Sequence, residues 1–376
     1  MLDKIDKLFF IKFGDSVEEF KRYLEKEKFG EDVCAPTWDY IPQFYTEFKD
    51  ILKNCSVYWI GIGGKQKKYL KNNNSYFITY KKNFSNIRIL YWLLKINPDL
   101  IINIAGQDSL FSIYPFKFMK KRTKILQFLA GEYIKNPFSI FFNSLLKISD
   151  KIYVMNNQTK KDLENKIKKS INIFVPLYTK EFLETNRKIT SIKQNKLNIF
   201  YCGRFSTIKG IWDLLQIIKE MKNENVVFHL IGEGSEYRSF KQKIKENGLD
   251  NLVRFYGFVP HFLLYDYLKQ ADIGLIPSKS EGYCQVAEEF LISNIPIIAT
   301  KVGGLIDRIE EGKNGYLIDE ENKIEKFIEK INYLNNNPEE IKKMKENITP
   351  AKYFDRENVF GKIVKNYYLE QIRSKK

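Results

Sequence analysis

Histidine and cysteine are scarce in this chain, which restricts the chemistry open to it. Among its 376 residues are two histidines and four cysteines. Two histidines cannot build a site of several imidazoles, and no two cysteines form a Cys-x-x-Cys pair. We therefore expect no metal centre and no disulfide framework, only reduced thiols as in the cytosol. The cysteines are Cys34, Cys55, Cys202 and Cys284.

Long apolar segments are also missing. No run of 18 or more apolar residues occurs, so no transmembrane helix is predicted. Residues 1–7 include acids and lack the basic-then-apolar layout of a secretion signal. These absences together predict a cytoplasmic chain.

Acidic residues are depleted in one part of the sequence. The net charge is +16, and residues 51–200 hold 27 Lys+Arg against 8 Asp+Glu. A basic first half beside a near-neutral second half suggests two domains with different partners. A chain of 376 residues is also longer than one core usually serves.

Short apolar runs alternate with helical patterns, clearly in the second half and less cleanly in the first. Continuous apolar strands between helices indicate parallel sheets covered on both faces, so we predict two doubly wound α/β domains. Ligands of such sheets bind at the carboxyl ends of the strands, which favours the cleft between the domains. The predicted strands are 8–13, 56–60, 100–104, 124–128, 151–155, 171–175, 197–202, 226–231, 253–255, 273–276, 296–299 and 316–318.

Domain boundaries follow from the same pattern. Pro176 and the polar stretch 185–196 have the composition of a linker. We predict a first, Rossmann-like domain over residues 1–185 and a second over residues 186–350. Residues 351–376 have helical spacing and are predicted to return as a helix toward the first domain.

A pair of carboxylates near position 285 is the most informative feature. Glu281 leads a glycine-containing turn, an apolar stretch follows, and Glu289 lies eight positions after Glu281. We expect a loop and then a helix whose N-terminus offers unpaired N–H groups and partial positive charge to a phosphate. Glu281 and Glu289 would lie two helical turns apart and bind hydroxyls on both sides of that phosphate. Glu288 is expected on the solvated face of the helix.

Six segments occur in a fixed order along the second half of the chain: 203–210, 231–234, 255–259, 281–289, 296–300 and 303–304. Together they resemble glycosyltransferase family 4 (group 1), whose members are retaining enzymes of the GT-B fold. The agreement in order and spacing covers residues 197–320, whereas the first half matches in layout only. The resemblance implies transfer of a hexose from a nucleotide sugar with the anomeric configuration kept.

By this resemblance, Arg204 and Lys209 contact the donor pyrophosphate. Charge-assisted hydrogen bonds of this kind contribute roughly 1.5–3 kcal/mol each. The two cations would also stabilise the leaving nucleotide diphosphate. No Asp-x-Asp occurs in the chain, so the metal handle of many other sugar transferases is missing. We expect a metal-independent enzyme without a cofactor.

The resemblance also assigns the rest of the donor site, which would hold a UDP- or GDP-sugar. Glu289 takes the ribose hydroxyls, since a carboxylate accepts from two adjacent hydroxyls, and Glu281 faces the donor sugar. The residues themselves leave open whether Gly232 approaches a ligand or only forms a turn, and Cys284 is expected to be packed. The expected contacts are Gly232, Glu233, Gly257, Phe258, Val259, Gly282, Tyr283, Cys284 and Gln285.

The first domain departs from the family pattern. Many relatives carry a histidine in its cleft, whereas His229 and His261 both fall in the second domain. His229 lies in an apolar strand and is expected to be a satisfied core residue. For the candidates at the strand ends of the first domain, acceptor contact and loop solvation both stay open. These candidates are Gly14, Asp15, Gln107, Asp108 and Glu132.

The stretch from Phe111 to Arg122 mixes aromatic residues with cations. Such a mixture suits a peripheral anchor on an anionic membrane, where each cation near the surface contributes about 1 kcal/mol. The alternative is a domain helix with a solvated basic face. We expect association with the inner face of the cell membrane.

The sequence thus favours a glycosyltransferase acting on a glycan or lipid-linked acceptor in bacterial surface polysaccharide synthesis, such as lipopolysaccharide or capsule. One alternative is a nucleotide-sugar epimerase of the GT-B fold, which the missing first-domain histidine argues against. The other is a basic nucleic-acid-binding protein, but no RRM, KH or helix-turn-helix signature accompanies the charge. Nucleic acid is therefore not expected as a partner.

Overall fold

The computed structural model describes residues 6–13, 15–29, 40–48, 55–64, 66–81, 85–104, 109–129, 139–176, 196–221, 225–354 and 356–373. The chain divides into two compact units. Unit 1 contains residues 1–177 and 356–376, and unit 2 contains residues 178–355.

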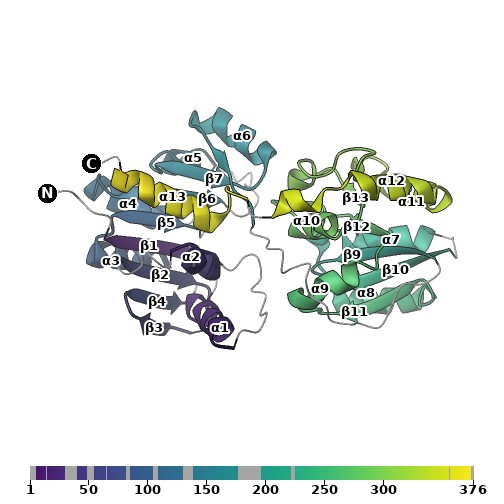
Figure 1. Ribbon diagram of the computed structural model, residues 1–376, viewed down its shortest axis with the longest axis horizontal. Helices are drawn as coiled ribbons and strands as arrows, with labels where there is room; N and C mark the ends of the chain where they lie inside the picture. The colour runs from purple at the N-terminus through teal and green to yellow at the C-terminus, as the bar shows by residue number, and fades with distance from the viewer. Residues whose placement is uncertain are drawn as a thin grey trace. The chain divides into compact units, whose positions relative to one another are not determined.

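Unit 1 is built on a mainly parallel sheet (Figure 1). Its strands are β1 (Lys7–Phe13), β2 (Ser56–Ile62), β3 (Lys68–Asn72), β4 (Ser75–Tyr80), β5 (Leu100–Asn103), β6 (Lys124–Leu129), β7 (Lys151–Val154) and β8 (Asn172–Ile173). Among the described residues they follow the order β3-β4-β2-β1-β5-β6-β7-β8, and the β3–β4 pair is antiparallel. Because β1 pairs with both β2 and β5, the direction of winding reverses between β1 and β5.

Helices cover both faces of this sheet. Phe10 and Trp59 stack at 3.9 Å between ring centroids on one face, and Phe44 and Phe360 pack against Phe10. That face carries α1 (Ser16–Phe29), α2 (Tyr40–Phe48) and the C-terminal helix α13 (Phe360–Arg373), which packs against α2. The opposite face carries α3 (Ser85–Ile96), α4 (Leu110–Met119), α5 (Ser139–Leu146) and α6 (Asn157–Ile167).

Unit 2 has a parallel sheet. Its strands are β9 (Leu197–Cys202), β10 (Val226–Ile231), β11 (Val253–Gly257), β12 (Ile273–Ile276), β13 (Ile297–Thr300) and β14 (Gly315–Ile318). In the described residues the order is β11-β10-β9-β12-β13-β14, so the winding reverses between β9 and β12. The residues of β9, β10, β12 and β13 are almost all buried, as expected for parallel strands covered on both faces, whereas the edge strands β11 and β14 are partly exposed.

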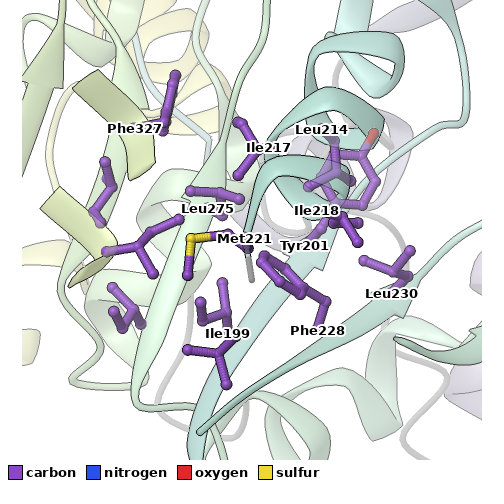
Figure 2. Close-up of a cluster of buried hydrophobic side chains, with 14 of the residues drawn as sticks. Ile199, Tyr201, Leu214, Ile217, Ile218, Met221, Phe228, Leu230, Leu275 and Phe327 are labelled. Atoms are coloured by element: carbon purple, nitrogen blue, oxygen red, sulfur yellow. The ribbon is translucent and has the colours of Figure 1, made fainter. Parts of the chain in front are cut away.

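Two apolar clusters hold the helices of unit 2 on its sheet. Figure 2 shows part of the larger one, where Leu214 and Ile218 lie over Phe228 and Leu230. This cluster includes α7 (Ile211–Glu220), α8 (Tyr237–Glu246), α11 (Lys323–Asn336) and α12 (Pro338–Asn347). The second cluster holds α9 (His261–Leu268) and α10 (Gln285–Ile292) on the other face.

The structure departs from the sequence prediction mainly in unit 1. The hairpin of β3 and β4 was not predicted, because β3 is a polar edge strand with the sequence KYLKN. The linker prediction at residues 185–195 falls outside the described residues. Among the helices that the structure describes, none is long and apolar enough to cross a bilayer.

Candidate functional site

The loops that follow β9 and β12 lie side by side at the carboxyl edge of the unit 2 sheet. Doubly wound sheets bind ligands at their carboxyl edge, at the point where the direction of winding reverses, which in unit 2 lies between β9 and β12. Lys279 N donates to Ile208 O at 2.9 Å and joins the two loops. Gly210 has φ +69°, and a Cβ there would lie 1.8 Å from Pro277 O. Glycine is therefore required where the two loops touch.

Lys209 and Glu281 form an ion pair between these loops. Lys209 Nζ lies 2.9 Å from Glu281 Oε1 and 2.8 Å from Oε2. Ser278 Oγ donates to Oε1 at 2.7 Å. The Glu281 side chain is 5% exposed and that of Lys209 34% exposed, so the carboxylate is sheltered while the ammonium reaches the surface. An ammonium has three donors, so Lys209 can hold Glu281 and still meet an anion.

Arg204 stands in the loop between β9 and a single 3-10 turn, Thr207–Lys209. Its carbonyl oxygen accepts from the Tyr201 hydroxyl at 3.0 Å, which fixes the backbone. Its side chain is exposed, and within the described ranges it forms no ion pair. Arg204 and Lys209 therefore precede α7, which begins at Ile211, and do not lie on it.

The predicted spacing of Glu281 and Glu289 along one helix is wrong. Cys284 adopts a left-handed conformation with φ +61°, so α10 begins only at Gln285. Glu281 lies in the preceding loop, and Glu289 alone of the two is helical. At the start of α10, Ala287 N donates to Cys284 O at 3.2 Å, so the N–H groups that can meet an anion there are those before Ala287. Cys284 itself is packed, and burial raises the pKa of its thiol.

Glu289 is buried on α10 and hydrogen-bonded through one oxygen. His261 Nε2 lies 2.9 Å from Glu289 Oε1, and Gln285 Nε2 donates to the same oxygen at 3.2 Å. Among the described residues no hydrogen bond reaches Oε2. Burial, and then the Glu289 charge, raises the pKa of the Cys202 thiol, which places Glu289 near the end of β9. The sequence did not assign His261, although its place directly after segment 257–259 was a signal.

Glu288 was expected in solvent and this prediction is wrong. Its exposed fraction is 1%, and its buried carboxylate accepts a hydrogen bond from the Tyr283 hydroxyl. The Arg308 guanidinium lies 3.5 Å from the centroid of the Tyr283 ring. Burial alone would lower the pKa of the Arg308 guanidinium, but its interactions with Tyr283 and Glu288 raise this pKa above its ordinary value. These three side chains brace the loop that carries Glu281.

Glycine backbones meet closely at the same edge. Gly232 has φ +126°, and a Cβ there would lie 2.0 Å from Gly203 O, while Gly232 N donates to Gly257 O at 2.7 Å. The turn alone thus requires Gly232. Gly303 has φ +47° and would place a Cβ 1.7 Å from Glu281 O. The backbone at residue 303 therefore fixes the position of the Glu281 loop.

The remaining donor-side candidates lie around these turns. Glu233 O accepts from Phe205 N at 3.0 Å, and the Glu233 side chain is exposed. Phe258 is exposed as well, whereas Val259 packs against the core under α9 and α10. Phe258 is thus an apolar side chain presented beside the carboxyl end of β11.

His229 is a satisfied core residue, as predicted. Its side chain is fully buried, with Nδ1 2.8 Å from the Tyr256 hydroxyl and Nε2 3.1 Å from Asn198 Oδ1. Burial, and then the charge of Arg254, lowers the pKa of His229 to about 4. It is therefore neutral at neutral pH.

Asp15 is the one acceptor-side candidate among the described residues. It caps α1, since its Oδ1 accepts from Val17 N at 3.1 Å and Glu18 N at 3.2 Å. Lys68 Nζ lies 2.9 Å from its Oδ2. Although burial would raise the pKa of Asp15, the hydrogen bond from Lys68 and those from its other partners lower it. Outside the described residues lie Gly14, Gln107, Asp108 and Glu132.

No group of three or more potential metal ligands occurs within the residues that the structure describes. Cys55, Cys202 and Cys284 are free thiols there. The segment from Phe111 to Arg122 forms most of α4 and the turn after it, with Phe111, Tyr114 and Phe118 exposed.

The family model for glycosyl transferases group 1 matches residues 182–350, which contain the carboxyl-edge loops described above. Among curated relatives, an uncharacterised glycosyltransferase of Methanocaldococcus jannaschii is 27% identical over 79% of this chain and 84% of its own length. A lipopolysaccharide 1,2-N-acetylglucosaminetransferase of Salmonella typhimurium is 23% identical over 77% of each chain.

Solved structures agree over nearly the whole chain. Sucrose-phosphate synthase from Thermosynechococcus elongatus has a TM-score of 0.69 at 16% identity, covering 99% of this chain and 100% of that chain. Anabaena HepE in complex with UDP has a TM-score of 0.65 at 14% identity, covering 98% and 99%. At these identities the likeness concerns the fold alone, and it confirms the predicted two-domain α/β fold of the GT-B class.

Proposed function

We propose that this chain, which belongs to the group 1 glycosyltransferases, moves a hexose from a UDP- or GDP-sugar to a glycan or lipid-linked acceptor and keeps the anomeric configuration. The observation that carries the proposal is the pair of buried carboxylates at the carboxyl edge of unit 2. Glu281 is held by Lys209, and Glu289 is held by His261 through one oxygen only. Unit 2 is then the donor domain and unit 1 the acceptor domain.

The donor is held by contacts of complementary chemistry. Glu289 Oε2 accepts the ribose hydroxyls, since Oε1 is occupied by His261 and Gln285. Glu281 accepts hydroxyls of the sugar, and the amides after Gly282 bind the phosphate and neighbouring hydroxyls. The backbone at Gly257 and Val259 receives the base, with Phe258 beside it. Structures of HepE with bound UDP support a uridine nucleotide as the first to test.

The reaction needs stabilisation of a leaving diphosphate. The bond between the anomeric carbon and the donor phosphate oxygen breaks, and the acceptor oxygen attacks from the same face. The acceptor proton passes to the departing phosphate oxygen, so no protein nucleophile is required. Arg204 and Lys209 neutralise the charge that develops on the diphosphate, which is the role a metal ion fills elsewhere. The transfer is therefore metal-independent.

The acceptor belongs to a bacterial surface polysaccharide such as lipopolysaccharide or capsule. The Salmonella relative, a lipopolysaccharide glycosyltransferase, supports this class of pathway. The exposed aromatic residues and cations of α4 support a peripheral position on the inner face of the cell membrane, where lipid-linked acceptors are found.

Nucleotide binding and product analysis test the proposal. Calorimetric titration with UDP, GDP, ADP and CMP, with and without EDTA, should give one binding series that EDTA does not change. Glu289→Ala and Arg204→Ala should each reduce turnover strongly while circular dichroism shows that the fold is intact. NMR of the product should show the anomeric configuration of the donor. Inversion, dependence on a divalent ion, or near-wild-type turnover in both variants would contradict the respective part of the proposal.

A further inference from the structure

Two neighbouring helices of unit 1 expose apolar stripes. On α3, Ile87, Tyr91 and Leu94 recur at helical spacing, and Ile87 is 70% exposed. On α4, the exposed residues Phe111, Tyr114 and Phe118 recur in the same way, and Phe118 is 73% exposed. The two helices pack against each other on one face of the sheet (Figure 1). The stripes therefore belong to one two-helix surface, whereas the sequence had singled out the α4 part alone.

A cation-lined hollow of about 700 Å³ lies at the end of α4. Its size falls within the range of about 300–1,000 Å³ that is usual for small-ligand pockets. Four cations and one carboxylate, Asp99, are among the residues that line it, and Met119 adds an exposed apolar side chain. The cations are Lys120, Lys121, Arg122 and Lys124.

The charges around the hollow leave a positive surface. Asp99 Oδ2 accepts from the amides of Asp6 and Lys7 at 2.9 and 3.0 Å, so this carboxylate is already engaged. Lys124 pairs with Asp150 at 3.1 Å. Lys120 and Lys121 are exposed and have no ion-pair partner within the described part of the chain.

The carbonyl groups at the end of α4 do not oppose an anion here. The C-terminus of a helix carries partial negative charge. Lys117 lies in the last turn of α4, where its positive charge offsets that of the helix end, and its Nζ donates to Lys121 O at 3.0 Å and to Thr123 O in the turn that follows. The hollow can therefore accept a phosphate in spite of its place at a helix C-terminus.

The hollow lies at the amino edge of its sheet, because residues 97–99 precede β5, residues 119–123 precede β6 and Lys124 is the first residue of β6. Doubly wound sheets place reacting ligands at the carboxyl edge. An occupant of the hollow is therefore an anchor and not the substrate that reacts.

We propose that the hollow binds the phosphate of an anionic phospholipid headgroup, while the stripes of α3 and α4 enter the apolar boundary of the same bilayer. This inference deepens the membrane association of the proposed function and rests on it. A bilayer fits better than a nucleic acid, because the exposed aliphatic side chains of Ile87 and Leu94 can be buried in the apolar part of a bilayer but not against the phosphates of a nucleic acid. Each cation at such a surface strengthens binding about five-fold.

Vesicle flotation of the full chain tests the proposal. Wild-type protein should float with phosphatidylcholine vesicles containing phosphatidylglycerol and much less with pure phosphatidylcholine. The double variant Lys120→Ala/Lys121→Ala should weaken binding about 25-fold, and Phe118→Ser should weaken it as well. The matched controls Lys219→Ala/Lys245→Ala and Tyr333→Ser replace exposed residues of unit 2 and should bind as wild type does.

The outcomes separate this inference from the donor site. All variants should keep the circular dichroism spectrum and thermal unfolding of wild type, which shows that unit 1 is folded, and they should bind nucleotide as wild type does. Equal flotation of the Lys120→Ala/Lys121→Ala variant and wild type would overturn the headgroup site. Equal flotation of wild type with phosphatidylglycerol-containing vesicles and with pure phosphatidylcholine vesicles would also overturn it. Binding of RNA without binding of vesicles would assign the surface to a nucleic acid instead. Wild-type flotation without any nucleotide binding would contradict the donor site and leave this inference standing.

Discussion

Arg204 and Lys209, the two cations of the proposed donor site, differ in their contacts, and so we expect their removal to have different effects. Lys209→Met removes the ammonium that contacts both oxygens of Glu281, whose side chain is 5% exposed. Breaking a buried ion pair costs about 3–5 kcal/mol, and breaking an exposed pair about 0–1 kcal/mol. Since Lys209 is 34% exposed, we expect a loss of about 2 kcal/mol in the free energy of unfolding.

Arg204→Met is the matched comparison. Its guanidinium is exposed and forms no ion pair with the described residues, so the unfolding free energy should change by at most about 0.5 kcal/mol. Both variants should lose a charge-assisted hydrogen bond to the donor diphosphate. A loss of roughly 1.5–3 kcal/mol corresponds to about 10- to 150-fold weaker binding.

Urea unfolding at pH 7 and calorimetric titration with nucleotide measure the two quantities separately. Lys209→Met/Glu281→Gln should recover part of the stability that Lys209→Met loses, because the uncompensated charge is removed, but it should not recover binding. A wild-type urea midpoint for Lys209→Met would refute the reasoning about the buried pair. Wild-type nucleotide affinity for Arg204→Met would refute its assignment to the diphosphate.

Two further predictions concern stability. The pKa of His229 is lowered to about 4 in the folded protein from an ordinary value of 6.5, so only the unfolded chain takes up a proton between these values. The contribution of His229 to the free energy of unfolding is therefore fully present above pH 6.5, and it falls by up to about 3 kcal/mol as the pH drops toward 4. Urea unfolding at pH 7 and at pH 4.5 should show this fall. The variant His229→Gln should lack it. Gly303→Ala should destabilise by more than about 2 kcal/mol, since its Cβ would meet Glu281 O at 1.7 Å, whereas Gly312→Ala, with φ +72° and open space, should cost about 1 kcal/mol. Equal thermal shifts for the two glycine variants would contradict this view of the loop.

The sheet of unit 2 could be predicted from the sequence because its strands are buried on both faces. Continuous apolar runs such as Val226–Ile231 give a strong local signal. The hairpin of unit 1 lacked that signal, since Lys68–Asn72 is a half-exposed edge strand. Local pattern thus identifies strands that are buried on both sides and misses those at an edge.

The candidate site could be predicted as a set of residues but not as a set of contacts. The sequence brought Arg204, Lys209, Glu281 and Glu289 to one sheet edge. It did not predict the contact of Lys209 with Glu281 or that of His261 with Glu289, because those contacts depend on where separate loops meet. Glu288 was misplaced for the same reason, since its burial depends on Tyr283 and Arg308 rather than on its own helix.

Hydrogen–deuterium exchange with and without saturating nucleotide tests the central claim most directly. We predict slower exchange in residues 203–210, 257–261 and 281–289, with little change along α3, α4 and the rest of unit 2. Protection confined to other segments, with these three unchanged, would contradict the assignment of the donor site to the carboxyl edge of unit 2.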